Sequence, residues 1–397
     1  MSEQSIGKKT VRDIDVAGKR VLVRADLNVP MENGVITDDT RIRESLPTLT
    51  YLLEHGAKVI VCSHLGRPKG VDASLSLSPV AGRLGNLLRR EVFFVEDCVG
   101  PVAEAAVRAT DGRFPVLLEN LRFHPEEEAN DPVFAAQLAS LADIFVNDAF
   151  GSAHRAHAST EGVTHFLPAV AGLLMEKEVR YLSALVANPP KPFAAVIGGA
   201  KVSTKIAAIE HLLPKLDMLL LGGGMANTFL KASGVNVQSS LVEDEQVETA
   251  RRIIAEAKSA GVATYLPVDV VAADKFAEDA NAVTVPVNAV PAGDMILDIG
   301  PESVERYAAA LAQAKAVVWN GPMGVFEMEK FANGSLSLAR VIAGLDATTV
   351  VGGGETAAVV GLSGLASRFT HVSTGGGASL EMLEGRILPG VASLMDA

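Results

Sequence analysis

Short apolar runs that alternate with longer stretches of helical periodicity are the feature that most limits how this chain folds. In the first half the runs are RVLVR (20–24), KVIVC (58–62), VFFV (92–95), PVLLE (115–119) and IFVN (144–147). In the second half they are AAVI (194–197), MLLL (218–221), AVVW (316–319) and TVV (349–351). Helical patterns such as 247–260 and 302–314 lie between them. This alternation predicts parallel α/β structure, because parallel strands need long crossover connections.

The length of 397 residues predicts two domains, since single cores stop growing at about 250–300 residues. Residues 172–187 have the apolar spacing of one helix, and NPPKP (188–192) ends it because proline cannot continue a helix. We therefore place the boundary there. We expect residues 1–187, ending in the interdomain helix 172–187, to form the first domain and residues 188–378 to form the second. The predicted fold is two Rossmann-like, three-layer α/β/α domains with parallel sheets, joined by a central helix and hinge.

The net charge of −12 argues against nucleic acid or an anionic membrane as the partner, because both require a basic face. Any anion must be met by a local positive site. Cys62 and Cys98 suggest no disulfide framework and suit a reducing compartment. The first residues, MSEQSIGKKT, lack the apolar core of a secretory signal, and no apolar stretch is long enough to span a membrane. We expect a cytoplasmic protein.

Glycine-rich turns follow the apolar runs of the second half. They are GGAK (198–201), GGGMA (222–226), NGPMG (320–324), GGGET (352–356) and TGGGAS (374–379). A single turn of this kind is more often structural, but five of them favour a phosphate-rich ligand, because helix N-termini offer unpaired N–H groups to anions. Lys201 and Lys205 follow the first turn. Their spacing fits two solvated lysines equally well, although cations at a helix start suggest a compensating anion.

Charged side chains follow the apolar runs of the first half instead. The turns RADLNVP, SHLGRP, LENLRFH and NDAFGSAHRAH contain Arg24, His64, Arg67, Arg122, His124, His154, Arg155 and His157, and DDTRIRE adds Arg41. A lone arginine is usually a solvated surface residue. Their recurrence in an acidic chain favours a small, highly charged anion, since guanidinium groups bind carboxylate and phosphate bidentately. The histidines could be ligands or structural residues, and no zinc-type spacing is present.

Together these motifs resemble the phosphoglycerate kinase family. RADLNVP, SHLGRP, ENLRFH, DAFGSAHRAH, GGAKVSTKI, GGGMA, WNGPMGVFE, GGGET and STGGGASLE occur in that family's order, and the resemblance extends from about Val21 to Gly390. It implies a monomeric, hinge-bending enzyme of glycolysis with two lobes. Such an enzyme reversibly transfers a phosphoryl group from 1,3-bisphosphoglycerate to ADP, giving 3-phosphoglycerate and ATP, with Mg²⁺ as cofactor.

The resemblance also implies roles for particular residues of the first half. Asp26 and Asn28 would contact the glycerate substrate, and Arg41 would meet the reacting group. The carboxylate and the distal phosphate would be held by His64, Leu65, Gly66, Arg67, Arg122 and Arg155. Residues 379–397 are implied to return to the first domain.

In the second half, Lys201 resembles the lysine on the transferred phosphoryl group and Lys205 the one on the nucleotide phosphates. Nucleoside contacts are implied for Asn320, Pro322 and Glu327. Phosphate-binding amides and the carboxylate on the metal side would come from Gly353, Gly354, Glu355 and Thr356. Amides near Gly353 and Gly376 would stabilise the transition state together with Arg41 and Lys201.

Three positions depart from the family's usual pattern. Glu355 stands where aspartate is usual and would place Mg²⁺, and its extra methylene moves the carboxylate by about one bond length. Ala25 and Leu27 replace valine and phenylalanine, which are packing changes.

The chemistry fits these residue types. Either nucleophile, an ADP phosphate oxygen or a carboxylate, is ionised near neutral pH, so no general base is needed. A loose phosphoryl transition state needs in-line positioning and positive charge, and the acyl phosphate must be kept from water by closure.

Two other functions remain open from the residues alone. Residues 352–357 match the G-x-G-x-x-A pattern of a nicotinamide dehydrogenase, but the acidic ribose ligand expected about 20 residues later is missing. A hinge-bending solute-binding protein also has two α/β lobes. The lack of a signal sequence and the different chemistry of the two halves disfavour it.

Overall fold

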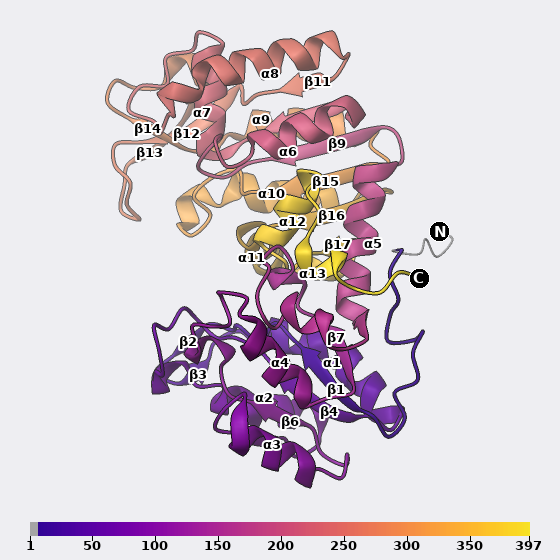
Figure 1. Ribbon diagram of the computed structural model, residues 1–397. Coiled ribbons are helices and arrows are strands. Elements are labelled where there is room, and N and C mark those ends of the chain that lie inside the picture. The colour runs from indigo at the N-terminus through magenta and orange to yellow at the C-terminus, as the bar shows by residue number, and fades with distance from the viewer. Residues whose placement is uncertain (1–6) are drawn as a thin grey trace. The chain divides into compact units, whose positions relative to one another are not determined.

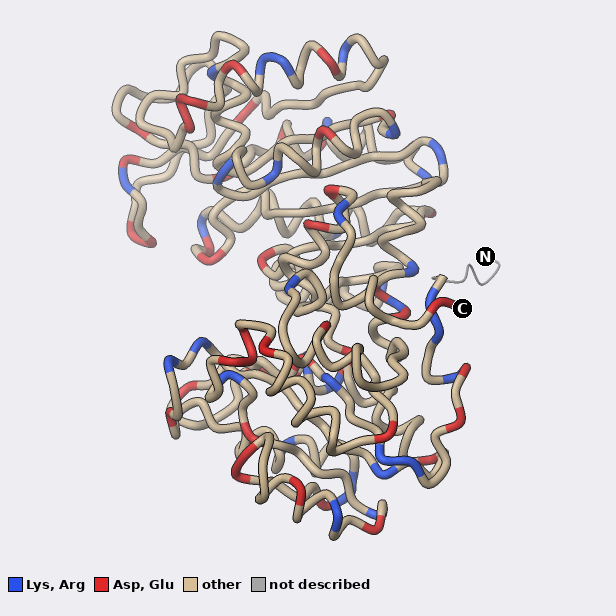
Figure 2. Tube along the Cα trace, in the orientation of Figure 1, with Lys and Arg blue, Asp and Glu red and all other residues tan. Residues whose placement is uncertain are grey.

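The computed structural model describes residues 7–397, which form two compact units (Figure 1). The first unit extends to Arg180 and also includes Ile387–Ala397, and the second is Tyr181–Arg386. The boundary between Arg180 and Tyr181 falls within helix α5 (Leu173–Ala187). Acidic residues are interspersed with lysines and arginines along the trace of both units (Figure 2). Within the described range, no helix combines the length and apolarity needed to cross a membrane.

The first unit contains a six-stranded parallel sheet flanked by helices. The strand order is β5 (Phe93–Val95), β6 (Val116–Leu118), β4 (Lys58–Cys62), β1 (Arg20–Arg24), β7 (Ile144–Asn147) and β8 (Ala169–Ala171). The helices are α1 (Thr40–Glu54), α2 (Ser78–Leu88), α3 (Gly100–Ala109), α4 (Pro132–Ser140) and the short C-terminal α13 (Pro389–Ala392). A small hairpin, β2 (Met31–Glu32) and β3 (Val35–Ile36), follows β1.

The apolar runs form strands because both faces of a parallel sheet are covered. RVLVR, KVIVC and IFVN are β1, β4 and β7 to the residue, and the register pairs Arg24 with Cys62. Their residues are almost all buried, as expected for strands between two helical layers. Ala25 and Leu27 are fully buried in this core, so both departures from the family pattern are packing changes.

The second unit contains another six-stranded parallel sheet flanked by helices. Its order is β11 (Ala263–Tyr265), β10 (Met218–Leu221), β9 (Phe193–Ile197), β15 (Ala316–Asn320), β16 (Thr348–Gly352) and β17 (His371–Val372). Its helices are α6 (Ile206–Leu212), α7 (Gly223–Ala232), α8 (Val247–Ser259), α9 (Pro301–Leu311), α10 (Asn333–Ala343), α11 (Gly354–Ser363) and α12 (Gly377–Leu383). The core surrounds Trp319, a fully buried residue on β15, which is one of the two middle strands.

The second unit also has a three-stranded antiparallel sheet that the sequence analysis did not predict. Its order is β13 (Ala282–Pro286), β12 (Asp269–Ala273) and β14 (Met295–Ile299). The edge strand β13 is largely exposed, so its sequence lacks the continuous apolar signal of the buried parallel strands. Strand β14 contributes three residues to a pocket described below.

Candidate active site

Adjacent parallel strands bring the predicted anion-binding residues of the first unit to one edge of its sheet. β6, β4, β1 and β7 are consecutive, and the residues after their carboxyl ends therefore share that edge. The residues placed there are Asp26 and Asn28 after β1, His64 to Arg67 after β4, Arg122 in the 3₁₀ turn Leu121–Phe123 after β6, and Arg155 after β7. Arg41 is in the first turn of α1.

Hydrogen bonds join the turn after β1 to helix α1 and to the turn after β4. Arg41 Nη1 donates to Asp26 Oδ1 at 2.9 Å, and the Asp26 carboxylate is nearly buried. The Gly66 amide donates to Asn28 Oδ1 at 2.9 Å. The Arg41 side chain is 34% exposed, so its remaining donors are available to an anion.

Two histidines at this edge are held neutral by their surroundings. Burial, and then neighbouring guanidinium groups, above all that of Arg24, lower the pKa of His64 well below its usual value. Burial also lowers the pKa of His157 to about 4, with Arg122 the next cause. The positive charge of this edge therefore comes from its arginines.

The remaining arginines differ in how many donors they have already used. Arg122 is nearly buried, donates from Nη1 to the Gly66 carbonyl at 2.7 Å and pairs with Glu128 at 3.0 Å. Arg155 is exposed and donates to the neighbouring His154 ring at 3.2 Å. Arg67 is exposed and has no hydrogen bond or ion pair with any residue that the structure describes. Arg67 and Arg155 thus present the most open guanidinium groups.

Sequence reasoning missed Asn120, the residue that holds the turn after β4. Asn120 is fully buried, accepts from the Leu65 amide at 3.1 Å and donates to the Leu65 carbonyl at 2.8 Å. Its Oδ1 also accepts from the Arg122 amide at 3.1 Å. One signal could have identified it, because a polar residue just beyond a buried strand needs a partner for its side chain.

A second group of potential ligands lies in the first unit although the sequence has no zinc-type spacing. The ligand atoms of Asp97, Cys98 and His124 lie within 4.8 Å of one another. His124 Nε2 and Asp97 Oδ1 already pair at 2.8 Å. Burial raises the pKa of the Cys98 thiol well above its usual value, so the thiol keeps its proton. A hydrogen bond between His124 and Asp97 and a buried thiol account for this group without a metal ion.

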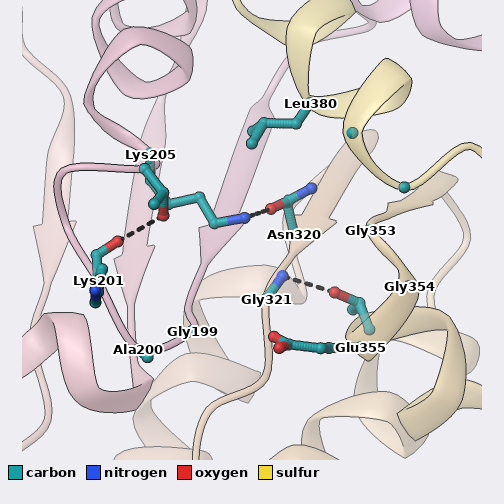
Figure 3. A pocket seen from close by; sticks show the side chains of 14 residues that line it. Gly199, Ala200, Lys201, Lys205, Asn320, Gly321, Gly353, Gly354, Glu355 and Leu380 are labelled. Carbon is teal, nitrogen blue, oxygen red and sulfur yellow. Dashed lines mark hydrogen bonds between the residues drawn. The ribbon is translucent and has the colours of Figure 1, made fainter. Parts of the chain in front are cut away.

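In the second unit, a pocket of about 460 Å³ lies at the carboxyl ends of the parallel strands (Figure 3). The turns that follow β9, β15, β16 and β17 form its walls. The predicted residues that line it are Lys201, Lys205, Asn320, Gly353, Gly354, Glu355, Thr356 and Gly376. The fold therefore gathers residues that are as far as 175 positions apart in the sequence, from Lys201 to Gly376.

The two lysines of the pocket have different environments. Lys205 Nζ donates to Asn320 Oδ1 (Figure 3), and burial lowers the pKa of Lys205 against the opposing effects of Glu355 and Glu384. Lys201 is exposed. The amide nitrogen of Asn320 is buried and has no hydrogen-bond partner among the described residues.

Two glycines with positive φ shape the wall of the pocket. Gly353 (φ 94°) precedes α11 and Gly376 (φ 52°) precedes α12, and a residue with a side chain would be strained at either position. Gly353, Gly354 and Glu355 line the pocket, so it lies at the start of α11, where unpaired N–H groups favour an anion. Thr356 is fully buried, and its hydroxyl oxygen accepts from the Gly321 amide at 2.6 Å.

A second pocket of about 420 Å³ shares Gly199, Ala200 and Glu355 with the first. Its walls are mostly apolar and include Leu241, Phe276, Met295, Ile296, Leu297, Pro322 and Val325, with the carboxylate of Glu327 at its edge. Strand β14 of the antiparallel sheet supplies three of these residues. A mostly apolar slot with the carboxylates of Glu327 and Glu355 suits an aromatic base that carries a hydroxyl-bearing sugar.

Comparison with known proteins gives one consistent result. The family model described as phosphoglycerate kinase matches residues 11–386. The phosphoglycerate kinase of Pelotomaculum thermopropionicum is 59% identical over 392 residues, which are 98% of this chain and 100% of that protein. That of Synechococcus elongatus is 59% identical over 403 residues, covering 100% of both.

Two solved structures are similar over almost the whole chain. The phosphoglycerate kinase of Coxiella burnetii has a TM-score of 0.88 and 43% identity, with 97% of this chain and 98% of that one covered. The phosphoglycerate kinase of Pyrococcus horikoshii has a TM-score of 0.82 and 32% identity, with the same coverage.

Proposed function

Because the chain belongs to the phosphoglycerate kinase family, it is a kinase of glycolysis that transfers a phosphoryl group between 1,3-bisphosphoglycerate and ADP, and we propose that its two units divide these substrates between them. One observation carries the proposal. The carboxyl edge of the first sheet presents guanidinium groups, and that of the second presents glycine turns and a helix N-terminus. Membership of this family excludes the two other functions, a dehydrogenase and a solute-binding protein.

The guanidinium edge binds 3-phosphoglycerate. The open groups of Arg67 and Arg155 bind the distal phosphate, with Arg122 and the His64–Gly66 turn alongside. Asp26 and Asn28 contact the glycerate. Arg41, fixed by Asp26 but partly exposed, points its free donors to the reacting carboxyl group.

The second unit binds the nucleotide. The base and the ribose occupy the apolar pocket, which is lined by Pro322 and Glu327 among others. The phosphates occupy the adjoining pocket, where the start of α11, Lys205 and the unpaired amide of Asn320 offer donors. Lys201, which is exposed at this pocket, contacts the phosphoryl group in transit.

Phosphoryl transfer itself requires charge and alignment more than proton transfer. Both nucleophiles are ionised, so the reaction proceeds as a direct in-line transfer. Arg41 and Lys201 neutralise the charge that develops on the equatorial oxygens, and the amides near Gly353 and Gly376 hold the nucleotide end. Since each substrate has its own unit, the transfer requires a closure that brings both substrates together and excludes water.

The pocket also fits Mg²⁺ bound with the nucleotide. Mg²⁺ is usually bound by one or two carboxylates together with substrate phosphates, and Glu355 supplies a carboxylate that lines both pockets. This carboxylate opposes the lowering of the Lys205 pKa, so it lies close to the phosphate-binding lysine. When bound, the ion would neutralise phosphate charge.

The remaining assignments are also proposals. Residues 1–187 act as the 3-phosphoglycerate domain, residues 188–378 as the nucleotide domain, and 379–397 as the segment that returns to the first. The protein acts as a hinge-bending monomer in the cytoplasm, where its two buried, unpaired cysteines would stay reduced.

A coupled assay tests the proposed function. The purified protein should phosphorylate 3-phosphoglycerate with MgATP, and product formation should stop when either substrate is omitted. Calorimetry should then find that Arg67→Ala weakens binding of 3-phosphoglycerate and leaves MgADP binding unchanged, whereas Lys205→Ala does the reverse. Loss of both affinities in either variant would contradict the division of substrates between the units.

A further inference from the structure

A buried network of hydrogen-bonded side chains lies behind the guanidinium edge of the first unit, and it connects His64, Arg24, Ser159 and Glu127. The phosphoryl transfer described above assigns no role to Arg24, Ser159 or Glu127. Arg24 is the last residue of β1, and only 1% of its surface is exposed. The register of β1 and β4 pairs Arg24 with Cys62, two residues before His64. Strand pairing itself therefore brings this guanidinium group to the imidazole ring.

All three nitrogens of Arg24 have partners inside the protein. Nε donates to Ser159 Oγ at 2.8 Å, Nη1 donates to the Ala25 carbonyl at 2.6 Å, and Nη2 lies 2.9 Å from His64 Nδ1. With these contacts and almost no exposed surface, Arg24 does not reach a bound substrate. It differs in this respect from the exposed Arg67 and Arg155.

Glu127 is at the other end of this network, and its carboxylate balances the buried charge of Arg24. It is fully buried and accepts from the Ser159 amide at 2.9 Å and from the Ser159 hydroxyl at 2.5 Å. A hydroxyl has one hydrogen, so donation to Glu127 leaves the Ser159 oxygen free to accept from Arg24. The direction of each hydrogen bond from Arg24 to Glu127 is thereby determined.

The contact with Arg24 also determines the state of His64. A guanidinium group has no acceptor, so it must be the donor and His64 Nδ1 must be the acceptor. An imidazole that accepts at Nδ1 is neutral and has its hydrogen on Nε2. Among the described residues, Nε2 has no hydrogen-bond partner, which leaves this donor available to a ligand.

We propose that Arg24 is a positioning residue that keeps His64 neutral with its hydrogen on Nε2, so that His64 is a fixed hydrogen-bond donor to the anionic glycerate substrate. The part that concerns the substrate rests on the proposed function. The substrate's charge is met by Arg41, Arg67, Arg122 and Arg155, while His64 contributes direction without a charge that varies with pH. Because Nδ1 accepts from Arg24 and Nε2 has the hydrogen, the ring has no free acceptor nitrogen to act as a general base.

The charges around His64 support this assignment. Arg24 faces the ring from β1, Arg41 from α1 and Arg122 from the turn after β6, and all three disfavour a positive ring. His157, whose Nδ1 lies 3.9 Å from Glu127, faces it as well. If Arg24 were lost, burial and the other two arginines would still disfavour a charged ring, but Nδ1 would lose its donor and the hydrogen would no longer be confined to Nε2.

The first test needs no variant of Arg24. Nitrogen NMR on protein with ¹⁵N-labelled histidine, with His64 identified by the signal missing in His64→Gln, reports which ring nitrogen has the hydrogen. The wild-type protein without ligand should show His64 neutral, with its hydrogen on Nε2, from pH 6 to pH 8. A hydrogen on Nδ1, or protonation of the ring within that range, would overturn the inference. If the ring is as expected but 3-phosphoglycerate does not shift its Nε2 signal, the substrate role of His64 fails and the assignment of its state remains.

The second test uses Arg24→Met, with Arg24→Lys as the matched control because lysine still donates. In Arg24→Met the donor to Nδ1 is removed, so the hydrogen should no longer be confined to Nε2, and nitrogen NMR should show a hydrogen on Nδ1 in part of the molecules. A ring with its hydrogen on Nδ1 presents an acceptor to the anion, so the KM for 3-phosphoglycerate should rise at least threefold, with kcat changed less than twofold. Arg24→Lys should retain the wild-type state of the ring, and adding His64→Gln to Arg24→Met should cause no further rise in KM. Folded Arg24→Met that keeps its hydrogen on Nε2 alone, with an unchanged KM, would contradict the proposal.

Discussion

Arg41 and Arg43 lie two residues apart on α1 and provide a matched test of the reacting-group site. Arg41 pairs with the nearly buried Asp26, whereas Arg43 pairs with Asp39, the residue that precedes this helix. We expect Arg41→Ala to lower kcat at least a hundredfold, because removing one donor to transition-state charge typically costs that much. Arg43→Ala should stay within about twofold in kcat. Steady-state kinetics of both purified variants make the comparison, and near-normal turnover by Arg41→Ala would refute its role.

Lys201 and Lys258 allow the same comparison in the second unit. Both are exposed, but Lys201 lines the phosphate pocket and Lys258 lies in the last turn of α8. Lys201→Ala should lower kcat at least a hundredfold with little change in thermal stability, since an exposed side chain contributes little to the fold. Lys258→Ala should change neither quantity. Equal kcat values in the two variants would contradict a role for Lys201 in phosphoryl transfer.

Glu355 tests the metal side of the nucleotide pocket. Glu355→Gln removes the charge but keeps the shape, so we expect it to weaken binding of MgADP at least tenfold while leaving binding of metal-free ADP and of 3-phosphoglycerate within about twofold. Glu355→Asp, which introduces the family's more usual residue, should retain most of the affinity for MgADP. Calorimetric titrations measure all three ligands, and equal losses for MgADP and 3-phosphoglycerate would contradict a metal-side position.

At the scale of elements, Asp298 on β14 joins two parts of the second unit. Its side chain accepts from the Gly334 amide in the first turn of α10 at 2.7 Å and from the Ile299 amide at 2.9 Å. A Cβ on Gly324 would lie 2.2 Å from Asp298 Oδ1, so the turn that lines the apolar pocket packs directly on this carboxyl group. Asp298 therefore positions β14, α10 and the turn after β15 together.

Burial raises the pKa of Asp298 from 3.8 to about 8. A carboxyl group with a raised folded-state pKa stabilises the fold fully below its unfolded-state pKa, and this stability is lost as pH rises to about 8. Burial raises the pKa of Asp148 to only about 7, and the neutral His64 and His157 affect stability mainly below pH 6.5.

Asp148 lies in the first unit and Asp298 in the second, so the stability of the second unit between pH 7 and pH 8 reports on Asp298. The free energy of unfolding of the second unit should fall by about 1 kcal/mol across this interval, and Asp298→Asn should remove this fall. Urea titrations at both pH values measure the difference. The exposed Asp274→Asn is the control and should keep it, and a fall that persists in Asp298→Asn would disprove the assignment.

At the scale of the whole molecule, the chain leaves the first unit and returns to it at Ile387–Ala397. The returning segment is integrated by its backbone. The Gly390 amide donates to the Ala153 carbonyl at 2.9 Å, Asn147 Nδ2 donates to the Gly390 carbonyl at 3.0 Å, and the Met395 amide donates to the Ala169 carbonyl at 2.9 Å. It therefore supports the turn after β7, which contains Arg155.

Deleting residues 388–397 should affect the two ligands differently. Leu388 and Leu394 are each only 3% exposed, so their loss uncovers part of the first unit's core. We expect the affinity for 3-phosphoglycerate to fall at least tenfold and that for MgADP to stay within about twofold, as measured by calorimetry. Asp396→Ala, which removes only the ion pair with Lys8, is the control and should have little effect. Equal loss of both affinities would show that the segment does not act through the first unit alone.

The sequence alone determined the parallel strands, the glycine turns and the family. RVLVR, KVIVC and MLLL are strands to the residue because their signal, a short apolar run between turn residues, is local. The motifs around His64, Lys201 and Glu355 were recognisable for the same reason, since their chemistry is contained in a few consecutive residues.

Only the tertiary structure decided how otherwise similar side chains are used. Arg24 ends β1 and Arg67 follows the end of the neighbouring strand β4, yet Arg24 is buried with partners 40 and 135 residues away and Arg67 is exposed. The antiparallel sheet that forms a wall of the apolar pocket likewise includes the exposed strand β13, whose sequence has no strong periodic signal. Burial and long-range hydrogen bonding depend on which distant segments pack together, and that is a property of the folded chain that no local pattern contains.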